Sequence, residues 1–198
     1  MPSALVLLAD GTEEMEFTIA YDTLVRAGVD TQSVYVPPDN GGTKAVSPPV
    51  AKGSRGINIM PDAYLDPTTC GPARYDLLVI PGGAIGAKTM SGNLVVHKLV
   101  RDFIAKGKYV GMICAGILAA LSSGLPSQPL TSHPSVKEDL QVDFQYSEDP
   151  VVVSGHLVTT RGPGTTFQFA LTLVELLCGK EKREEVRGPM VFPADTPW

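Results

Sequence analysis

The stretch "YVGMICAGILAALSSG", Tyr109 to Gly124, joins an apolar run to a helical segment with almost no loop between them. "YVGMI" is typical of a buried strand, and "AGILAAL" predicts a short helix that ends at Gly124. Cys114 then occupies the turn itself, where hydrolases of the nucleophile-elbow type display their attacking group and where helix N–H groups favour a thiolate. Cys114 is therefore a candidate nucleophile, and the alternative is a small core cysteine.

Apolar runs and segments of helical period alternate along the rest of the chain. Strands are predicted over 4–9, 31–36, 75–80 and 109–113, and helices over 13–28, 93–107, 115–124 and 165–179. A hairpin over 151–160 is expected to turn at Ser154–Gly155, and Thr165 and Gln168 have the spacing of a capping box. This order predicts an α/β fold with a mostly parallel sheet, helices on both faces, and a site at the carboxyl ends of the strands.

Length and composition favour one domain over residues 1–198, in which 37–56 forms a flexible loop with a short hairpin. The net charge of −5 leaves no basic face for nucleic acid, and no run is long enough for a membrane span. Three scattered cysteines and three scattered histidines predict neither disulfides nor a metal site. We expect a cytoplasmic protein, small enough to enter the nucleus.

Two further segments end at the same predicted edge of the sheet. In "PGG", the pair Gly82–Gly83 follows a strand and would let backbone N–H groups approach a ligand as an oxyanion hole requires, unless it forms only a tight turn. "DGTEEMEF" places Glu13, Glu14 and Glu16 at the start of the first helix, where acidic residues also occur simply because they interact favourably with the helix dipole.

Five motifs in this order carry a resemblance: "LADGTEEMEF", "VIPGG", "ICAG", "TSHP" and "TTRGPGT". They resemble the ThiJ/PfpI superfamily, in the branch that contains the parkinsonism-associated protein deglycase and the glutathione-independent glyoxalases. The resemblance runs from Ala4 to about Pro189. It implies a flavodoxin-like sandwich, usually a homodimer, with a cysteine on a nucleophile elbow.

The resemblance also implies roles for particular residues. Glu16, protonated, would donate a hydrogen bond to the thiolate of Cys114, and His133 of "TSHP" would lie close by. Gly82, Gly83 and Ala115 would bind the substrate oxygen. The partner subunit would contribute Arg26, Arg55 and Pro189, on the evidence of shorter motifs.

The function implied is a glutathione-independent glyoxalase that converts methylglyoxal to lactate without metal or organic cofactor, through a hemithioacetal on Cys114. Removal of glycation adducts from proteins or nucleotides would use the same residues. A redox-sensing stress protein or a holding chaperone that uses an oxidisable Cys114 is the alternative. A cysteine peptidase is disfavoured because Ala115, and not histidine, follows the cysteine. Sequence alone does not divide the roles of Glu16 and His133.

Overall fold

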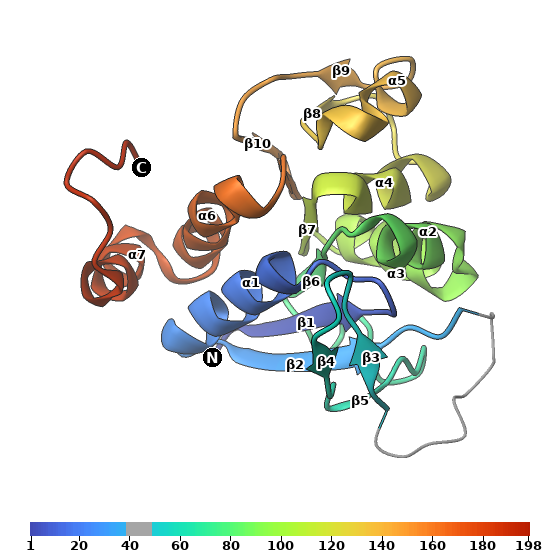
Figure 1. Ribbon diagram of the computed structural model, residues 1–198, viewed down its shortest axis with the longest axis horizontal. Helices are drawn as coiled ribbons and strands as arrows, with labels where there is room; N and C mark the ends of the chain where they lie inside the picture. Colours follow the sequence, from blue (N-terminus) through green and yellow to red (C-terminus); the bar gives the residue numbers. More distant parts are fainter. Residues whose placement is uncertain (39–48) are drawn as a thin grey trace.

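A seven-stranded sheet forms the middle layer of the computed structural model, which describes residues 1–38 and 49–198 (Figure 1). The strand order is β10-β11-β7-β6-β1-β2-β5, and every neighbouring pair is parallel except β10–β11. The strands are β1 (Ser3–Leu8), β2 (Asp30–Tyr35), β5 (Ala63–Tyr64), β6 (Leu77–Ile80), β7 (Tyr109–Ile113), β10 (Val151–Ser154) and β11 (Leu157–Thr160). The predicted mostly parallel sheet is confirmed.

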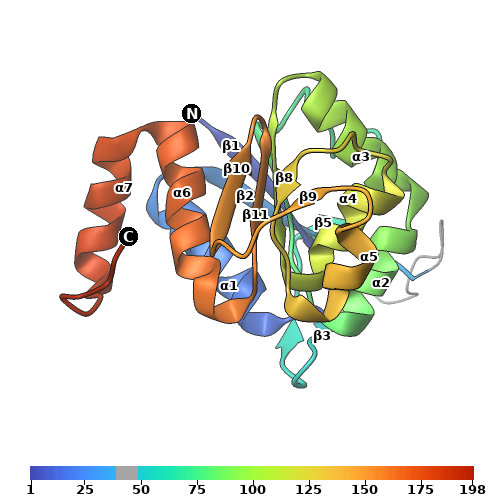
Figure 2. The ribbon, with the colours of Figure 1, turned by 90° about the horizontal axis from the view of Figure 1, so that it is seen from above.

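Helices cover both faces of this sheet, as predicted (Figure 2). On one face lie α1 (Glu14–Arg26) and α6 (Thr166–Cys178), with α7 (Lys180–Arg187) packed on α6. On the other lie α2 (Ala84–Gly92), α3 (Leu94–Ala105) and α4 (Leu118–Ser122), with α5 (Lys137–Leu140) beside α4. Neither α2 nor α7 is predicted from the sequence, because "AIGAKTMSG" has weak amphipathic character and "KEKREEVR" buries only Val186.

The central strand β1 shows why the fold needs two helical layers. Its alternate residues Ala4, Val6 and Leu8 belong to the hydrophobic cluster under α1 and α6. Leu5 and Leu7 point the other way and join the cluster under α2, α3 and α4. A strand that is apolar on both faces is stable only when both are covered, which is the condition of a parallel α/β sheet.

Several short strands and 3₁₀ turns lie in the segments outside the main strands and helices. A two-stranded hairpin pairs β3 (Ala51–Lys52) with β4 (Asn58–Ile59), which confirms the hairpin expected near the end of the 37–56 segment. Residues 39–48 of that predicted loop lie outside the described residues. The remaining short elements are β8 (Pro129–Leu130), β9 (Gln145–Tyr146) and the 3₁₀ turns η1 (Cys114–Ile117), η2 (Pro134–Val136), η3 (Pro163–Thr165) and η4 (Gly188–Met190).

Two local predictions are wrong. The β10–β11 hairpin pairs Ser154 with Leu157, so its turn is Gly155–His156, one residue later than expected. The Thr165 hydroxyl does not form a capping box with Gln168; it accepts the N–H groups of Arg161 and Gly162 at 3.2 Å and so stabilises the turn before α6. A hydroxyl satisfies whichever backbone donors lie nearest, and here η3 brings the preceding turn closer.

Candidate active site

Cys114 forms the elbow between β7 and the helical segment that follows. Its φ of +60° is a left-handed conformation that side chains other than glycine rarely adopt, and such strain is concentrated at functional sites. Gly116 makes the turn possible, since a Cβ at that position would lie 2.7 Å from the carbonyl oxygens of Ile80 and Pro81. The predicted elbow is confirmed, and it displays a half-buried thiol at the carboxyl edge of the sheet.

The carboxyl group of Glu16 reaches this thiol from α1. Its side chain is fully buried, its Oε2 accepts the N–H of Gly82 at 2.7 Å, and it hydrogen-bonds to Cys114. Among the described residues, its Oε1 has no hydrogen-bond partner. Glu13 fixes the start of α1 by accepting the N–H of Glu16 at 2.8 Å. Hydrogen bonds thus hold both the backbone N–H and the carboxyl group of Glu16.

Burial sets the protonation of this pair. Burial raises the pKa of Glu16 from its ordinary value of 4.5 to about 7. The hydrogen bonds from Gly82 and Cys114 favour the carboxylate and lower the pKa, but by less. Burial first, and then the charge of Glu16, raises the pKa of Cys114 to about 12. Both shifts oppose the charged forms, and the thiolate expected at this helix N-terminus stays a prediction. The N–H groups of Ala115 and Gly83 lower the pKa of Cys114, but by less than burial raises it.

Above pH 7 the pair of Glu16 and Cys114 carries one negative charge and one proton. Moving the proton from the sulfur to the carboxylate gives the thiolate beside a protonated glutamate, which is the arrangement that the family resemblance implies. Both forms have the same net charge, so no proton has to be exchanged with solvent. Glu16 can therefore act as the base that activates Cys114.

The backbone donors at the site come from two of the three expected residues. The N–H groups of Ala115 and Gly83 hydrogen-bond to the sulfur of Cys114 and so face the point where a substrate oxygen would develop charge. Gly82 does not share this role, because its N–H is already bound to Glu16. Gly82 instead provides space, since a Cβ there would lie 2.7 Å from both the Cys114 Cβ and Glu16 Oε2.

His133 lies at the rim of the same cleft. Its backbone N–H donates to the carbonyl of Cys114 at 3.4 Å, and its exposed ring precedes η2. The cleft has a volume of about 430 Å³. Its lining residues are Glu13, Met15, Glu16, Ser54, Arg55, Gly83, Ala84, Cys114, Ala115, His133, Ser135 and Pro163. Sequence reasoning missed Ser54, Ser135 and Pro163, whose only signal was proximity to predicted motifs.

Arg55 lines the cleft of its own chain, whereas the resemblance assigned it to the partner subunit. Glu14 holds it there: its carboxylate accepts the N–H of Arg55 at 2.6 Å and the hydroxyl of Ser54 at 2.9 Å. Burial opposes ionisation of Glu14, but these bonds together lower its pKa. A Cβ at Gly53 would overlap the Glu14 side chain, so this hairpin needs glycine at that position.

Arg26 and Pro189 do not line the Cys114 cleft. They border a separate cavity of about 310 Å³, with Asp22, Phe167 and Met190. Arg26 forms a salt bridge with Asp22 at 2.5 Å, between two side chains that are each about half exposed. A role for Arg26 or Pro189 in the chemistry would therefore have to be exerted on a second copy of the chain.

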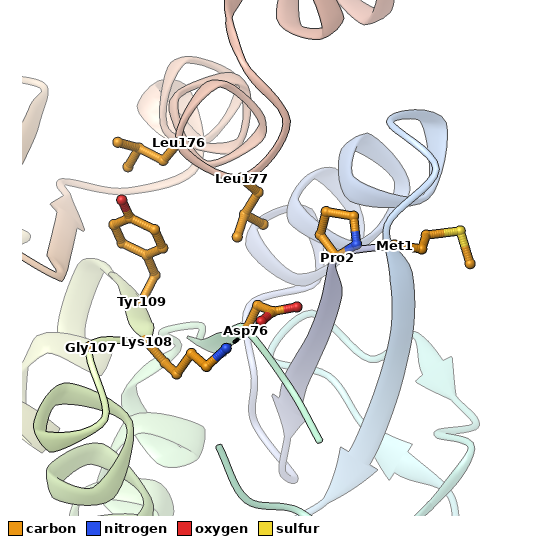
Figure 3. Close-up of a pocket in the computed structure, with 8 residues that line it drawn as sticks. All are labelled: Met1, Pro2, Asp76, Gly107, Lys108, Tyr109, Leu176 and Leu177. Atoms are coloured by element: carbon orange, nitrogen blue, oxygen red, sulfur yellow. Dashed lines mark hydrogen bonds and ion pairs between the residues drawn. The ribbon is translucent and has the colours of Figure 1, made fainter. Parts of the chain in front are cut away.

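A larger cavity, about 490 Å³, lies at the opposite, amino-terminal edge of the sheet (Figure 3). Its polar side chains already satisfy each other, because Lys108 donates to Asp76 at 2.6 Å. No cysteine or histidine is among its described lining residues, and its carboxylate and ammonium groups are engaged with each other. The chemistry is therefore assigned to the smaller Cys114 cleft.

Within residues 1–38 and 49–198, no group of three or more histidine, cysteine or acidic side chains is arranged to hold a metal ion. No helix in these ranges combines the length and the apolar character needed to cross a bilayer.

The half-buried Cys178 and the buried Cys70 lie outside the cleft. Cys70 is only 3% exposed.

Comparison with known proteins gives consistent matches over the whole fold. The model of the DJ-1/PfpI family matches residues 2–176. The glutathione-independent glyoxalase DJ-1 of Schizosaccharomyces pombe is 37% identical over 196 residues, 98% of this chain and 100% of the relative. The Parkinson disease protein 7 homolog of Danio rerio is 38% identical over 193 residues, 96% of each chain. The solved structure of Schizosaccharomyces pombe DJ-1 superposes with a TM-score of 0.87 at 34% identity, covering 96% of this chain and 100% of that one.

Proposed function

The chain belongs to the DJ-1/PfpI family, and we propose that it is a glutathione-independent glyoxalase that converts methylglyoxal to lactate. The observation that carries the proposal is the contact between a strained, half-buried Cys114 and a fully buried Glu16, beside the N–H groups of Gly83 and Ala115. A nucleophile, an adjacent base and oxyanion donors are the groups that addition to an aldehyde requires. A relative that is similar over its full length is named for this activity.

The first step is addition of the thiol to the aldehyde. As the Cys114 sulfur bonds to the aldehyde carbon, its proton passes to the Glu16 carboxylate, and the carbonyl π electrons move to the oxygen. The Gly83 and Ala115 N–H groups, which face the sulfur, stabilise that oxygen while it is charged. Return of the proton from Glu16 gives the neutral hemithioacetal.

The second step moves a hydrogen between the two substrate carbons. Glu16 or His133 removes the proton from the aldehyde-derived carbon. The released electron pair forms the C=C bond of an enediolate as the hydroxyl proton passes to the neighbouring carbonyl oxygen. Reprotonation at the neighbouring carbon leaves a thioester of lactate on Cys114. Water then cleaves the thioester, which restores the thiol and releases lactate, so methylglyoxal and one water balance one lactic acid.

The size of the cleft favours a second substrate class. Its volume of about 430 Å³ lies in the range of sites for drug-sized ligands and exceeds what a three-carbon aldehyde fills. An early adduct of methylglyoxal with an amine or thiol would fit the same opening, with the same attack by Cys114. We therefore keep deglycation as the second candidate.

We also propose that the active form is a homodimer. Met15 borders the cleft and is 55% exposed, and Ile57 at the base of the Arg55 hairpin is 59% exposed. Arg26 and Pro189 line a cavity outside the cleft of their own chain. A two-fold contact over α1 and this hairpin would cover those apolar side chains and could bring Arg26 and Pro189 to the partner's site.

The deciding experiment incubates the purified protein with methylglyoxal in the absence of glutathione and measures lactate. Cys114→Ala is the matched control, and its fold is checked by circular dichroism. Lactate from the wild type and none from Cys114→Ala is expected; equal amounts from both would refute the proposal. Preformed adducts, tested with and without an excess of a dicarbonyl scavenger, separate deglycation from consumption of free methylglyoxal.

A further inference from the structure

The ring of His133 is held by a residue two positions further along the chain. Its Nδ1 accepts the backbone N–H of Ser135 at 3.2 Å and lies 2.8 Å from the Ser135 hydroxyl oxygen. His133 thereby serves as the N-cap of η2. Pro134, the first residue of that turn, fixes the backbone between the two residues.

These contacts decide which ring nitrogen carries the proton. A backbone N–H can only donate, so it favours a lone pair on the Nδ1 that faces Ser135, with the hydrogen of the neutral ring on Nε2. The Ser135 hydroxyl can rotate to donate to the same lone pair. The opposite tautomer would turn two donors, Nδ1–H and the Ser135 N–H, toward each other.

The proton-bearing nitrogen is available to a substrate. Among the described residues, Nε2 of His133 has no hydrogen-bond partner, and its ring borders the Cys114 cleft. The adjacent Cδ2 lies 3.8 Å from the position that a Cβ on Gly162 would occupy, so Gly162 packs beside the ring. The backbone bond from His133 to the Cys114 carbonyl ties this ring to the elbow.

We propose that Ser135 is a positioning residue that holds His133 as its Nε2–H tautomer, so that His133 donates a hydrogen bond to a substrate oxygen and Glu16 alone moves the proton. The inference rests on the proposed glyoxalase function and divides the roles of these two residues. A ring whose lone pair is bound to Ser135 has no free electron pair to accept a proton from carbon. A donor at Nε2 instead stabilises the enediol oxygen as its charge develops.

Each proton then has one path. Glu16 takes the proton from the aldehyde-derived carbon and returns it to the neighbouring carbon, and the electron pair passes through the enediol between these two events. The Nε2–H of His133 remains on nitrogen throughout. The hydroxyl proton of the hemithioacetal passes directly to the neighbouring oxygen of the same molecule, so the step balances without a redox partner.

The primary test is nuclear magnetic resonance of protein labelled with ¹⁵N in its histidines, recorded at pH 8 without substrate. The His133 signals, assigned with His133→Ala, should show an unprotonated Nδ1 and a protonated Nε2. His97 is an internal reference, because its Nε2 lies 2.5 Å from the Ser91 carbonyl oxygen, which can only accept. A protonated Nδ1 on His133 would overturn the proposal.

Kinetics of position 135 give the second test. Ser135→Ala removes the shorter of the two contacts, so we expect some Nδ1–H tautomer and a kcat about fivefold lower, with KM nearly unchanged. Ser135→Thr keeps the hydroxyl and should restore both. Ser147→Ala, which removes the exposed hydroxyl that bonds to Asp149, is the matched control and should change neither. A Ser135→Ala variant with the wild-type tautomer and kcat would overturn the role of Ser135.

The two proposals fail separately. The tautomer is read without substrate, so an inactive wild type with the expected His133 signals would refute the glyoxalase function and leave the tautomer assignment in place. Lactate formation by a protein whose His133 carries the proton on Nδ1 would refute the division of roles and leave the function intact.

Discussion

The backbone N–H of Gly82 donates to Oε2 of Glu16 at 2.7 Å, which joins α1 to the turn after β6 at the side of the Cys114 thiol. The two residues are 66 positions apart in sequence. This bond aims a buried carboxyl group at the nucleophile and takes Gly82 out of the oxyanion hole.

The three cysteines should differ sharply on substitution. Cys114→Ala is expected to abolish lactate formation and to retain the fold, because it removes only the sulfur from the elbow. Cys70→Ser and Cys178→Ser should keep turnover within a few-fold of wild type. Since Cys70 is 3% exposed, Cys70→Ser should lower the free energy of unfolding by roughly 1–3 kcal/mol, measured by urea titration.

The rate should rise with pH through about 7. Glu16, with its pKa raised to about 7 by burial, must lose its proton before it can accept that of Cys114, so kcat/KM is expected to follow this ionisation. Glu16→Gln should lower kcat/KM by about 100-fold or more and remove the inflection near pH 7. A wild-type profile that is flat between pH 5.5 and 8.5 would argue against Glu16 as the base.

Stability should change with pH in the opposite direction. Glu16 has an ordinary pKa of 4.5 and a folded pKa of about 7, so between these values the folded state binds more protons than the unfolded state. The free energy of unfolding should therefore fall by up to about 3 kcal/mol as pH rises from 4.5 to 7, through this residue. Denaturant titrations of Glu16→Gln should lack this loss, whereas Glu181→Gln, at an exposed site, should keep it.

Gly83 should not tolerate a side chain. Its φ is +86°, and a Cβ there would overlap the carbonyl oxygen of Gly11 and lie 2.6 Å from the Glu13 nitrogen. Gly83→Ala is expected to destabilise the protein by about 3 kcal/mol or more and to displace an oxyanion donor. Gly71→Ala is the control, because no atom outside its neighbours lies within 4 Å of a Cβ at that position. Thermal melting of both variants is the measurement. An equal loss of melting temperature in Gly83→Ala and Gly71→Ala would contradict this prediction.

Mild peroxide should oxidise Cys114 in preference to Cys70 and Cys178. Cys70 is buried, and burial raises the pKa of Cys178 with no acceptor for its proton comparable to Glu16. Two equivalents of peroxide convert the thiol to a sulfinate, whose oxygens protonated Glu16 and the N–H groups of Gly83 and Ala115 would bind. Peptide mass spectrometry should find sulfinate at Cys114, and less of it in Glu16→Ala. Equal oxidation of all three cysteines would remove the basis for a redox-sensing role.

The sequence by itself determined the α/β order, the elbow at Cys114 and the candidates Glu16 and Gly83, whereas His133 was implied only by the family resemblance. These are local properties: apolar alternation sets which segments are strands or helices, and short motifs such as "ICAG" specify turns through the conformations that their residues allow. Parallel strands then bring their carboxyl ends to one edge, which is why residues from separate motifs were expected together.

Only the tertiary structure decided how those groups interact. Contacts between elements distant in sequence decide three features of the site. The Gly82 N–H donates to Glu16, the Arg55 N–H donates to Glu14, and burial raises the pKa of Cys114. Whether an N–H is free, and how far a charge is removed from water, depends on three-dimensional position rather than on residue type. The residues of the site follow from the chain; its protonation and its donors follow from packing.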